Sequence, residues 1–481
     1  MRERAILMAA TLLAGCSLAP PHERPALPTA GAYPGNPAGG VIRAVDLDWR
    51  DFIVDPRLEV LVGQALERNR DLAQSVARIE EARGQYRIQN AERLPQIDGT
   101  AGFTRSRSNT ASFGGAAGGV GGGTGTGTGG VTSFTFNRYD IGVGVSSFEL
   151  DFWGRVRNLS EAARAQYLST VQAERAFRLS LIRDVSSTYF ASREAAERVA
   201  LAERTVTSRR EGVRIAKRRL DAGVTSALDY RQAETLLTQA ETELASLRLT
   251  QAQTDNALSV LVGGPITTPL PDPLRLDAQQ LQRALDPGLP SELMTNRPDI
   301  LSAEETLRAA RANIGAARAA FFPSISLTGS AGFASNQLDG LFTNDTLTWS
   351  FGPAIRLPIF DGGALRGNLT VARARENIAV AAYEKAVQVA FQEVADTLAG
   401  RRWLADQVAA QQRAVVAQRS LARLARLRYQ NGVAQYLEVL DAERNLFDAE
   451  QALIQLHRAD ADNLVAFYVA LGGGLSGPAA P

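Results

Sequence analysis

Cysteine and histidine are almost absent from this sequence of 481 residues. It has one cysteine, Cys16, and two histidines, His22 and His457, which lie far apart in the chain. A lone cysteine cannot pair within its own chain, and zinc sites need ligands grouped at short spacings. The sequence therefore predicts no disulfide framework, no metal site and no cofactor, and it offers no group of residues typical of a catalytic centre.

The chain also lacks an excess of charge of one sign and any long apolar run. Lysine and arginine total 52 and aspartate and glutamate total 51, so the formal net charge is +1. This balance gives no reason to expect nucleic acid as a partner. A helix that spans a bilayer needs about 20 mostly apolar residues, and no such run is present in the sequence.

The start of the chain resembles an export signal. Residues 1–15 hold a short basic stretch and then a short apolar stretch that ends in Leu13-Ala-Gly-Cys16. This ending resembles the lipobox of bacterial lipoproteins, which implies cleavage before Cys16 and its acylation with a diacylglycerol and an N-acyl chain. The alternative is an ordinary signal peptide with a chance cysteine. Residues 16–45, rich in proline and glycine, are predicted to form a lipidated tether.

Two regions alternate between large and small residues with the period of a β-strand. Tyr139, Ile141, Val143 and Val145 are large and apolar, whereas the positions between them are glycine or charged. Such alternation predicts strands with one apolar face, and we place a strand pair at about 97–150, with a glycine-rich loop at 113–130. A second pair is predicted at about 324–358. Prolines 353 and 358 argue for strand ends or bends there.

Each strand pair is followed by a long helical hairpin. A turn with aspartate and glycine, at 151–154 and again at 360–363, opens a long stretch without proline that is rich in helix formers. These stretches end at Gly223 and Gly432, where Gly-Val begins a turn into a second helix. Asp151 and Asp361 are interpreted as helix caps and not as a catalytic pair.

The sequence thus contains one unit twice. The first repeat covers 46–265 and the second covers 289–473, with a linker at 266–288 and a short C-terminal segment at 474–481. Each repeat supplies two strands and two long antiparallel helices, and lipid tolerates no open β edge. Three copies would close a barrel of about twelve strands. A water-soluble helical rod with a β cap is the alternative.

Seven motifs, in this order and partly duplicated, carry a resemblance to a known family. They are Leu13-Ala-Gly-Cys16, Asn69-Arg-Asp-Leu72, Phe148-Glu-Leu-Asp-Phe-Trp-Gly154, Leu289-Pro-Ser-Glu-Leu293 with Arg297-Pro-Asp-Ile300, Phe322-Pro-Ser-Ile-Ser-Leu327, Leu357-Pro-Ile-Phe-Asp-Gly-Gly363, and Tyr429-Gln-Asn-Gly-Val433 with Tyr436-Leu-Glu-Val-Leu-Asp441. Over nearly all of the mature chain, the sequence resembles TolC-type outer-membrane efflux proteins of the OprM- and NodT-like lipoprotein branch.

This resemblance implies a fold, a location and partners. The fold would be mainly α with a β-barrel portion: a trimeric, 12-stranded outer-membrane barrel, four strands per chain, continued by a long periplasmic α-helical tunnel. The protein would be a passive exit duct of a Gram-negative bacterium and not an enzyme. Its partners would be two further copies of itself, outer-membrane lipid, a periplasmic adaptor protein and an inner-membrane pump such as an RND transporter.

The resemblance also assigns roles to residues at the two helical turns. The turns would be periplasmic tips that contact the adaptor, through Gly223, Val224 and Thr225 and through Gly432, Val433 and Ala434. The alternative is that both glycines are needed only for the geometry of the turn.

The same resemblance places an acidic ring and a latch at the tunnel entrance. Glu438 and Asp441 are three residues apart and share a helix face, so three copies would gather six carboxylates there. A solvated outer helix face is the alternative. Asp229 and Tyr429 match a pair that holds the entrance shut through a hydrogen bond between neighbouring coils. A second family latch uses an arginine where this chain has Ala434, so the closed state is expected to be held differently.

Function is left with several alternatives at this stage. Efflux of small toxic compounds or drugs is the first, and type I protein secretion and metal efflux by a duct of the same fold are others. A structural envelope lipoprotein without a pore is a further class. The sequence has no clusters of methionine or histidine, which disfavours metal export.

Overall fold

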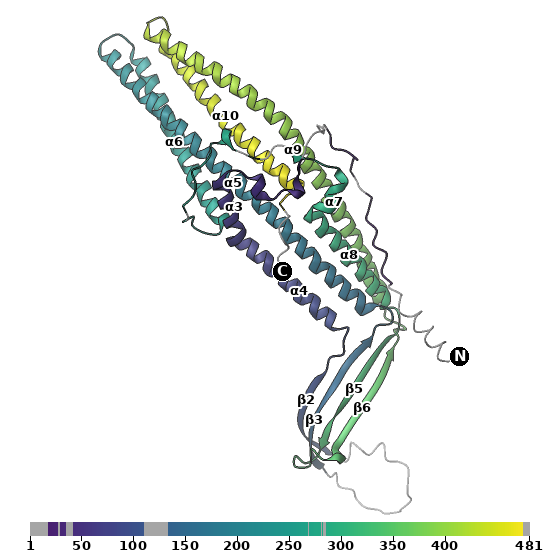
Figure 1. Ribbon diagram of the computed structural model, residues 1–481. Helices are drawn as coiled ribbons and strands as arrows, with labels where there is room; N and C mark the ends of the chain where they lie inside the picture. Colours follow the sequence, from purple (N-terminus) through teal and green to yellow (C-terminus); the bar gives the residue numbers. More distant parts are fainter. Residues whose placement is uncertain are drawn as a thin grey trace, which may run out of the picture. The chain divides into compact units, whose positions relative to one another are not determined.

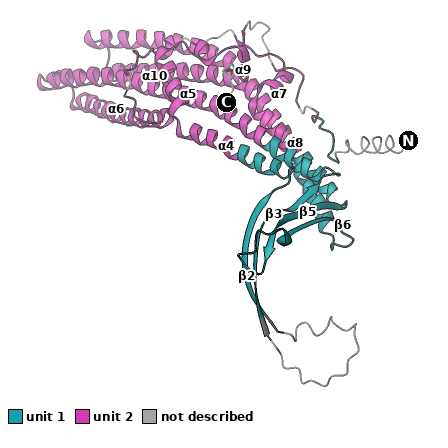
Figure 2. Cartoon of the chain, turned by 60° about the horizontal axis from the view of Figure 1, so that its bottom comes forward, with its two compact units in different colours: residues 1–23, 82–166, 308–378 teal, residues 24–81, 167–307, 379–481 magenta. Residues whose placement is uncertain are grey.

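The computed structural model describes residues 18–26, 29–34, 42–109, 133–267, 269–279, 281 and 285–474. Cys16, the signal at 1–15 and the predicted glycine-rich loop at 113–130 lie outside the described residues. The chain forms two compact units (Figure 2). Unit 1 comprises residues 1–23, 82–166 and 308–378, and unit 2 comprises 24–81, 167–307 and 379–481. Each unit therefore draws on both sequence repeats.

Unit 1 contains a four-stranded antiparallel sheet with the strand order β2-β3-β5-β6 (Figure 1). The strands are β2 (Asp98–Asn109), β3 (Ser133–Leu150), β5 (Ser324–Ser335) and β6 (Leu347–Arg356). The two hairpins, one from each repeat, join along β3 and β5, where Gly142 lies opposite Gly332. A β-bulge shifts the register between Val145 and Phe148. One continuous sheet thus forms from both halves, and β2 and β6 are its outer strands.

The large apolar residues of the sheet do not pack into a core of this chain. Ile141 is 38% exposed and Val143 is 56% exposed. On β6, Trp349, Phe351 and Ile355 are 66–76% exposed. An apolar face of this size on a folded chain marks a surface that meets lipid or another apolar partner. The alternation in the sequence therefore corresponds to one exposed apolar face.

Pro353 corrects the expectation that proline marks an end or a bend of this strand. It lies inside β6, directly opposite Leu327 of β5. Proline lacks an N–H group, so it cannot donate to a ladder, but an outer strand has one side on which no donor is needed within the sheet. The position of β6 at the margin of the sheet makes this proline compatible with regular pairing.

The turns after the strand pairs are fixed by aspartate and tryptophan. Asp151 accepts a hydrogen bond from the backbone N–H of Arg157 at 2.6 Å, and Asp361 accepts one from Leu365 at 2.6 Å. These bonds satisfy free N–H groups in the first turns of α5 (Arg155–Asp221) and α9 (Ala364–Gln430). Trp153 donates from Nε1 to the Pro323 carbonyl at 2.9 Å, which joins the corresponding points of the two repeats.

The main core lies in unit 2, and α5 and α9 contribute to it. The remaining elements of the described chain are α2 (Trp49–Phe52), α3 (Pro56–Arg68), α4 (Arg70–Ala91), α6 (Ala227–Val262), α7 (Leu293–Asn296), α8 (Pro298–Ala319) and α10 (Tyr436–Ala470), with two short strands, β1 (Ile42–Arg43) and β4 (Leu285–Asp286), and four 3-10 turns at Ala44–Asp46, Leu276–Ala278, Pro290–Glu292 and Asn344–Thr346. Phe52 stacks on Tyr468 with ring centroids 4.2 Å apart, and both side chains are fully buried. The buried Tyr189 donates to the carboxylate of Asp55, which caps α3.

The N-terminal segment is packed where it is described. Within unit 1, Arg318 donates to the Leu18 carbonyl at 2.9 Å and Arg311 donates to the Glu23 carbonyl at 2.7 Å. Within unit 2, Tyr33 is 4% exposed and stacks on Phe391. The prediction of a tether did not anticipate this packing, because a segment rich in proline and glycine shows no periodic apolar pattern.

Two helical hairpins extend from the core of unit 2, α5 with α6 and α9 with α10 (Figure 1). α5 and α9 are each continuous over 67 residues. No helix in the described part of the chain combines the length and the apolar character needed to cross a membrane.

Candidate functional site at the helical tips

The two tips have the same backbone structure. In the first, the Gly223 N–H bonds the Leu220 carbonyl and the Val224 N–H bonds the Arg219 carbonyl, both at 2.9 Å. At the second, Gly432 and Val433 repeat this pattern at 3.0 and 2.9 Å. This is the Schellman type of helix ending, which needs a left-handed residue. The φ angles of Gly223 and Gly432 are 70° and 74°, and a Cβ on either would meet no neighbour within 4 Å, so the backbone alone selects glycine.

The residue after each glycine is a valine whose side chain is exposed to solvent. Val224 is 66% exposed and Val433 is 70% exposed. The residues that follow them, Thr225 and Ala434, are half-buried. Each hairpin of unit 2 thus ends in an exposed valine that is available to a partner.

The two predicted entrance acids lie in the first turns of α10 and are exposed. Glu438 forms an ion pair with Arg428 at 3.4 Å, and Asp441 forms one with Arg444 at 3.2 Å. Their side chains are 42% and 53% exposed, so these ion pairs contribute little to the stability of the fold. Each carboxylate thus has a basic neighbour in its own chain. A ring of six acids would require three chains and stays a prediction.

The predicted latch residues have separate contacts in the single chain. Asp229 accepts a hydrogen bond from the hydroxyl of Thr225, and Ser226 caps α6 through the N–H of Asp229. The ring of Tyr429 lies beneath the guanidinium of Arg219, 4.6 Å from its centroid, and 4.9 Å from the ring of Tyr436. Arg219 on α5 and Tyr429 on α9 thereby join the two hairpins. The hydrogen bond between neighbouring coils stays a prediction.

Sequence reasoning missed a second contact between the hairpins. A Cβ on Gly212 of α5 would lie 2.6 Å from the hydroxyl oxygen of Tyr436, so any other residue here would displace the tyrosine ring from its present position. Burial, together with the charge of Glu443, raises the pKa of Tyr436 to about 12. A glycine inside a helix made of strong helix formers can mark such an approach, and it was the one signal present in the sequence.

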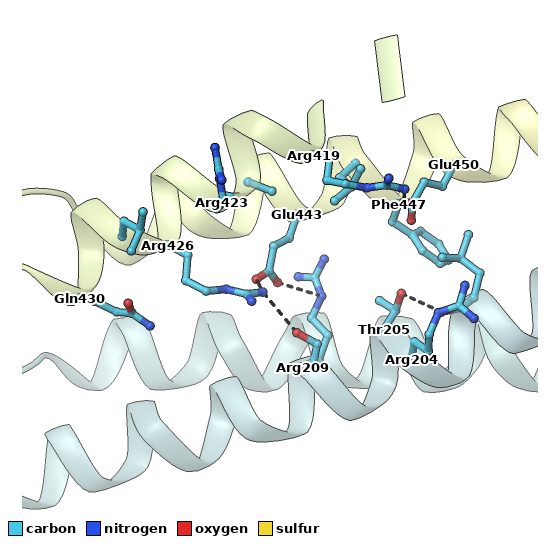
Figure 3. A pocket seen from close by; sticks show the side chains of 15 residues that line it. Arg204, Thr205, Arg209, Arg419, Arg423, Arg426, Gln430, Glu443, Phe447 and Glu450 are labelled. Atoms are coloured by element: carbon cyan, nitrogen blue, oxygen red, sulfur yellow. Dashed lines mark hydrogen bonds and ion pairs between the residues drawn. The ribbon is translucent and has the colours of Figure 1, made fainter. Parts of the chain in front are cut away.

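A charged cluster lies beside this contact (Figure 3). Glu443 of α10 pairs with Arg426 of α9 at 2.5 Å and with Arg209 of α5 at 3.9 Å. Arg426 also donates to the Ser208 hydroxyl at 3.5 Å. One carboxylate therefore holds arginines from both hairpins. These residues line a cleft of about 370 Å³, the arginine cleft, whose lining is Leu201, Arg204, Thr205, Ser208, Arg209, Arg419, Ala422, Arg423, Arg426, Leu427, Gln430, Glu443, Leu446, Phe447 and Glu450.

Known proteins are similar to this chain in both sequence and fold. The model of the family described as outer membrane efflux protein matches residues 61–264 and 289–473, one match in each repeat. The chain is 42% identical over 480 residues to the solvent efflux pump outer membrane protein SrpC of Pseudomonas putida, covering 98% of each. It is 39% identical over 469 residues to the cation efflux system protein CusC of Escherichia coli O6:H1, covering 97% of each.

A solved structure agrees with these relatives. The open state of the MtrE outer membrane channel of Neisseria gonorrhoeae superposes with a TM-score of 0.84 at 40% identity, covering 96% of this chain and 99% of that one. The predicted fold class and the outer-membrane location are thereby confirmed. The chain has two strand pairs and two 67-residue helices, one of each per repeat, and it matches the family model over both repeats. It therefore belongs to the outer membrane efflux protein family.

Proposed function

We propose that three copies of this chain form the exit duct of a tripartite efflux system. The observation that carries the proposal is the sheet with two outer strands, β2 and β6, whose apolar face is exposed. An open sheet edge cannot persist in lipid, so the outer strands must pair with those of other copies. Three such sheets give about twelve strands, which suffice to enclose a channel. The duct is passive and catalyses no reaction.

Small toxic organic compounds are the proposed cargo. The relatives are named for solvent efflux and for cation efflux, so the family name alone does not choose between them. Export of soft metal ions favours methionine, cysteine and histidine ligands along the path. This chain has three methionines, two histidines and one cysteine, and these numbers favour organic cargo.

The tips are proposed to contact a periplasmic adaptor, which connects the duct to an inner-membrane pump such as an RND transporter. The exposed Val224 and Val433, each after a left-handed glycine, supply the apolar part of that contact. Glu438 and Asp441 are proposed to line the entrance, and Asp229 and Tyr429 to hold it shut. Adaptor binding would then favour an open arrangement of the inner coils. Cys16 is proposed to carry the lipid anchor.

Two measurements test this proposal. The purified protein in a planar bilayer should show single-channel conductance, and a protein that forms no pore would contradict the duct. For the tips, Val224→Ser with Val433→Ser should weaken adaptor binding at least tenfold while leaving conductance unchanged. Val260→Ser is the matched control, because Val260 is 76% exposed on α6 and lies far from the tip in sequence. Equal adaptor affinity in both variants would refute the tip contact.

A further inference from the structure

The arginine cleft carries more positive charge than its own acids can balance. Five arginines line it, at positions 204, 209, 419, 423 and 426, against two glutamates, Glu443 and Glu450. Both glutamates are already engaged: Glu443 pairs with Arg426 and Arg209, and Glu450 pairs with Arg419 at 2.6 Å. Within the described residues, no ion pair reaches Arg204 or Arg423. Three positive charges in the cleft are thus without a countercharge from its lining.

Arg209 shows that this excess is not confined to a solvated surface. Its side chain is 6% exposed, and its nearest carboxylate oxygen, on Glu443, is 3.9 Å away. The Nη1 atom of Arg209 is buried and has no hydrogen-bond acceptor among the described residues. A buried donor of a charged group without an acceptor is unfavourable, and it favours any ligand that brings an anionic oxygen.

Five of the other residues that line the cleft are apolar. Leu201, Ala422, Leu427, Leu446 and Phe447 form this part of the wall. In Figure 3, Arg209 and Arg426 reach from facing helices toward Glu443, and Phe447 lies to one side of this group. The volume of about 370 Å³ falls within the range of small-molecule sites, which are mainly apolar with a few placed polar groups. An inorganic anion would leave this apolar wall uncovered.

We propose that the arginine cleft binds a small amphipathic organic anion. The carboxylate, sulfonate or phosphate group of the ligand lies against Arg204 and Arg209, and its aliphatic or aromatic body lies against the leucines and Phe447. Because the cleft is built from α5, α9 and α10, the bound anion connects the two hairpins. The inference is independent of transport, since binding requires neither conductance nor an adaptor.

Calorimetry on the full chain in lipid nanodiscs tests this proposal, with empty nanodiscs as the blank. The probes are 2-naphthoate, the neutral 2-naphthylmethanol with nearly the same body, and inorganic phosphate, an anion without a body. We expect saturable binding of naphthoate in the submillimolar range, and at least tenfold weaker binding of the other two probes. Equal binding of naphthylmethanol would overturn the role of charge, and equal binding of phosphate would overturn the role of the apolar wall.

Variants then locate the site. Arg204→Gln and Arg209→Gln should each weaken naphthoate binding at least tenfold. Arg204 makes no ion pair among the described residues, so Arg204→Gln should leave the fold intact. Weaker binding by this variant would therefore report the loss of the charge and not misfolding. Arg210→Gln is the matched control, since Arg210 follows Arg209 on the same helix but is 65% exposed and pairs with Glu241 of α6. Absence of saturable binding, or affinity unchanged in the two cleft variants, would refute the site.

Discussion

Replacing Arg297 by methionine would remove four hydrogen bonds that join three helices of unit 2. The guanidinium donates twice to Asp299 of α8, at 3.0 and 2.6 Å, once to Glu393 of α9 at 2.7 Å, and once to the Ala470 carbonyl of α10 at 3.0 Å. Arg297 is 9% exposed, whereas the side chains of Asp299 and Glu393 are 38% and 41% exposed. The cost therefore depends on which partners water can reach after the substitution.

The magnitude follows from this difference in exposure. Removing one partner of a fully buried ion pair costs about 3 to 5 kcal/mol. Here water can solvate both carboxylates once the arginine is gone, which lowers that cost. The Ala470 carbonyl is shielded and loses a charged donor, which alone costs about 1 to 3 kcal/mol. We expect Arg297→Met to lower the free energy of unfolding by about 2 to 3 kcal/mol.

A second arginine of the chain supplies the control. Arg275 makes the same two-bond contact with the aspartate two residues later, Asp277, at 3.1 Å for both bonds, but its side chain is 71% exposed. Arg275→Met should therefore cost at most about 1 kcal/mol. Urea denaturation in detergent, followed by helical circular dichroism, measures both variants. Equal losses would show that burial does not determine the strength of these pairs and would refute the reasoning.

Three further outcomes follow from the structure. Burial raises the pKa of Asp462 from 3.8 to about 6, so between these values the folded chain keeps a proton that the unfolded chain loses, and stability falls as pH rises. Asp462→Asn should remove that loss, so the free energy of unfolding of the variant minus that of the natural chain, measured in urea, should increase by about 1.4 kcal/mol from pH 5 to pH 7.5; a difference independent of pH would contradict this. A Cβ on Gly332 would overlap the Ile141 carbonyl of the paired strand, so Gly332→Ala should abolish the folded oligomer on a native gel. Gly329→Ala on the same strand should not, because its Cβ would lie 3.6 Å from the Ser350 carbonyl, an ordinary contact. Gly432→Ala would place alanine at a φ of 74°, which costs about 1 to 2 kcal/mol, and should speed hydrogen exchange at that tip only; protection equal to that of the natural chain would count against the turn geometry.

The fold follows from local patterns that the sequence shows openly. Alternation with period two around Ile141 and Val143 corresponds to β3, and proline-free stretches of helix formers correspond to α5 and α9. Duplication then shows that the two halves are equivalent. The prediction of a strand end or bend at Pro353 was wrong, because the place of a strand within its sheet depends on tertiary structure. The packing of Tyr33 was missed for the same reason, since its partner, Phe391, lies in the other half of the chain.

The candidate site was predictable in its backbone and not in its side-chain contacts. Gly223 and Gly432 predict left-handed turns, because few other residues accept a positive φ. The partner of Tyr429 could not be read from the sequence: it is Arg219, which comes from the other hairpin. The cleft around Arg209 was missed likewise, because arginines on a long helix look alike until packing buries one of them. A lone glycine, Gly212, was the signal nearest to this region.

The two outer strands of the sheet differ in length and sequence, β2 having 12 residues and β6 having 10. In the proposed ring of three copies, each copy meets the next head to tail, β6 of one against β2 of the next, and the ring closes only when every member offers both strands. A single chain with a damaged β6 would still dock by its β2 and then prevent closure. Such an allele should be dominant over the intact gene in the same cell, so that inheritance itself reports how the copies are joined.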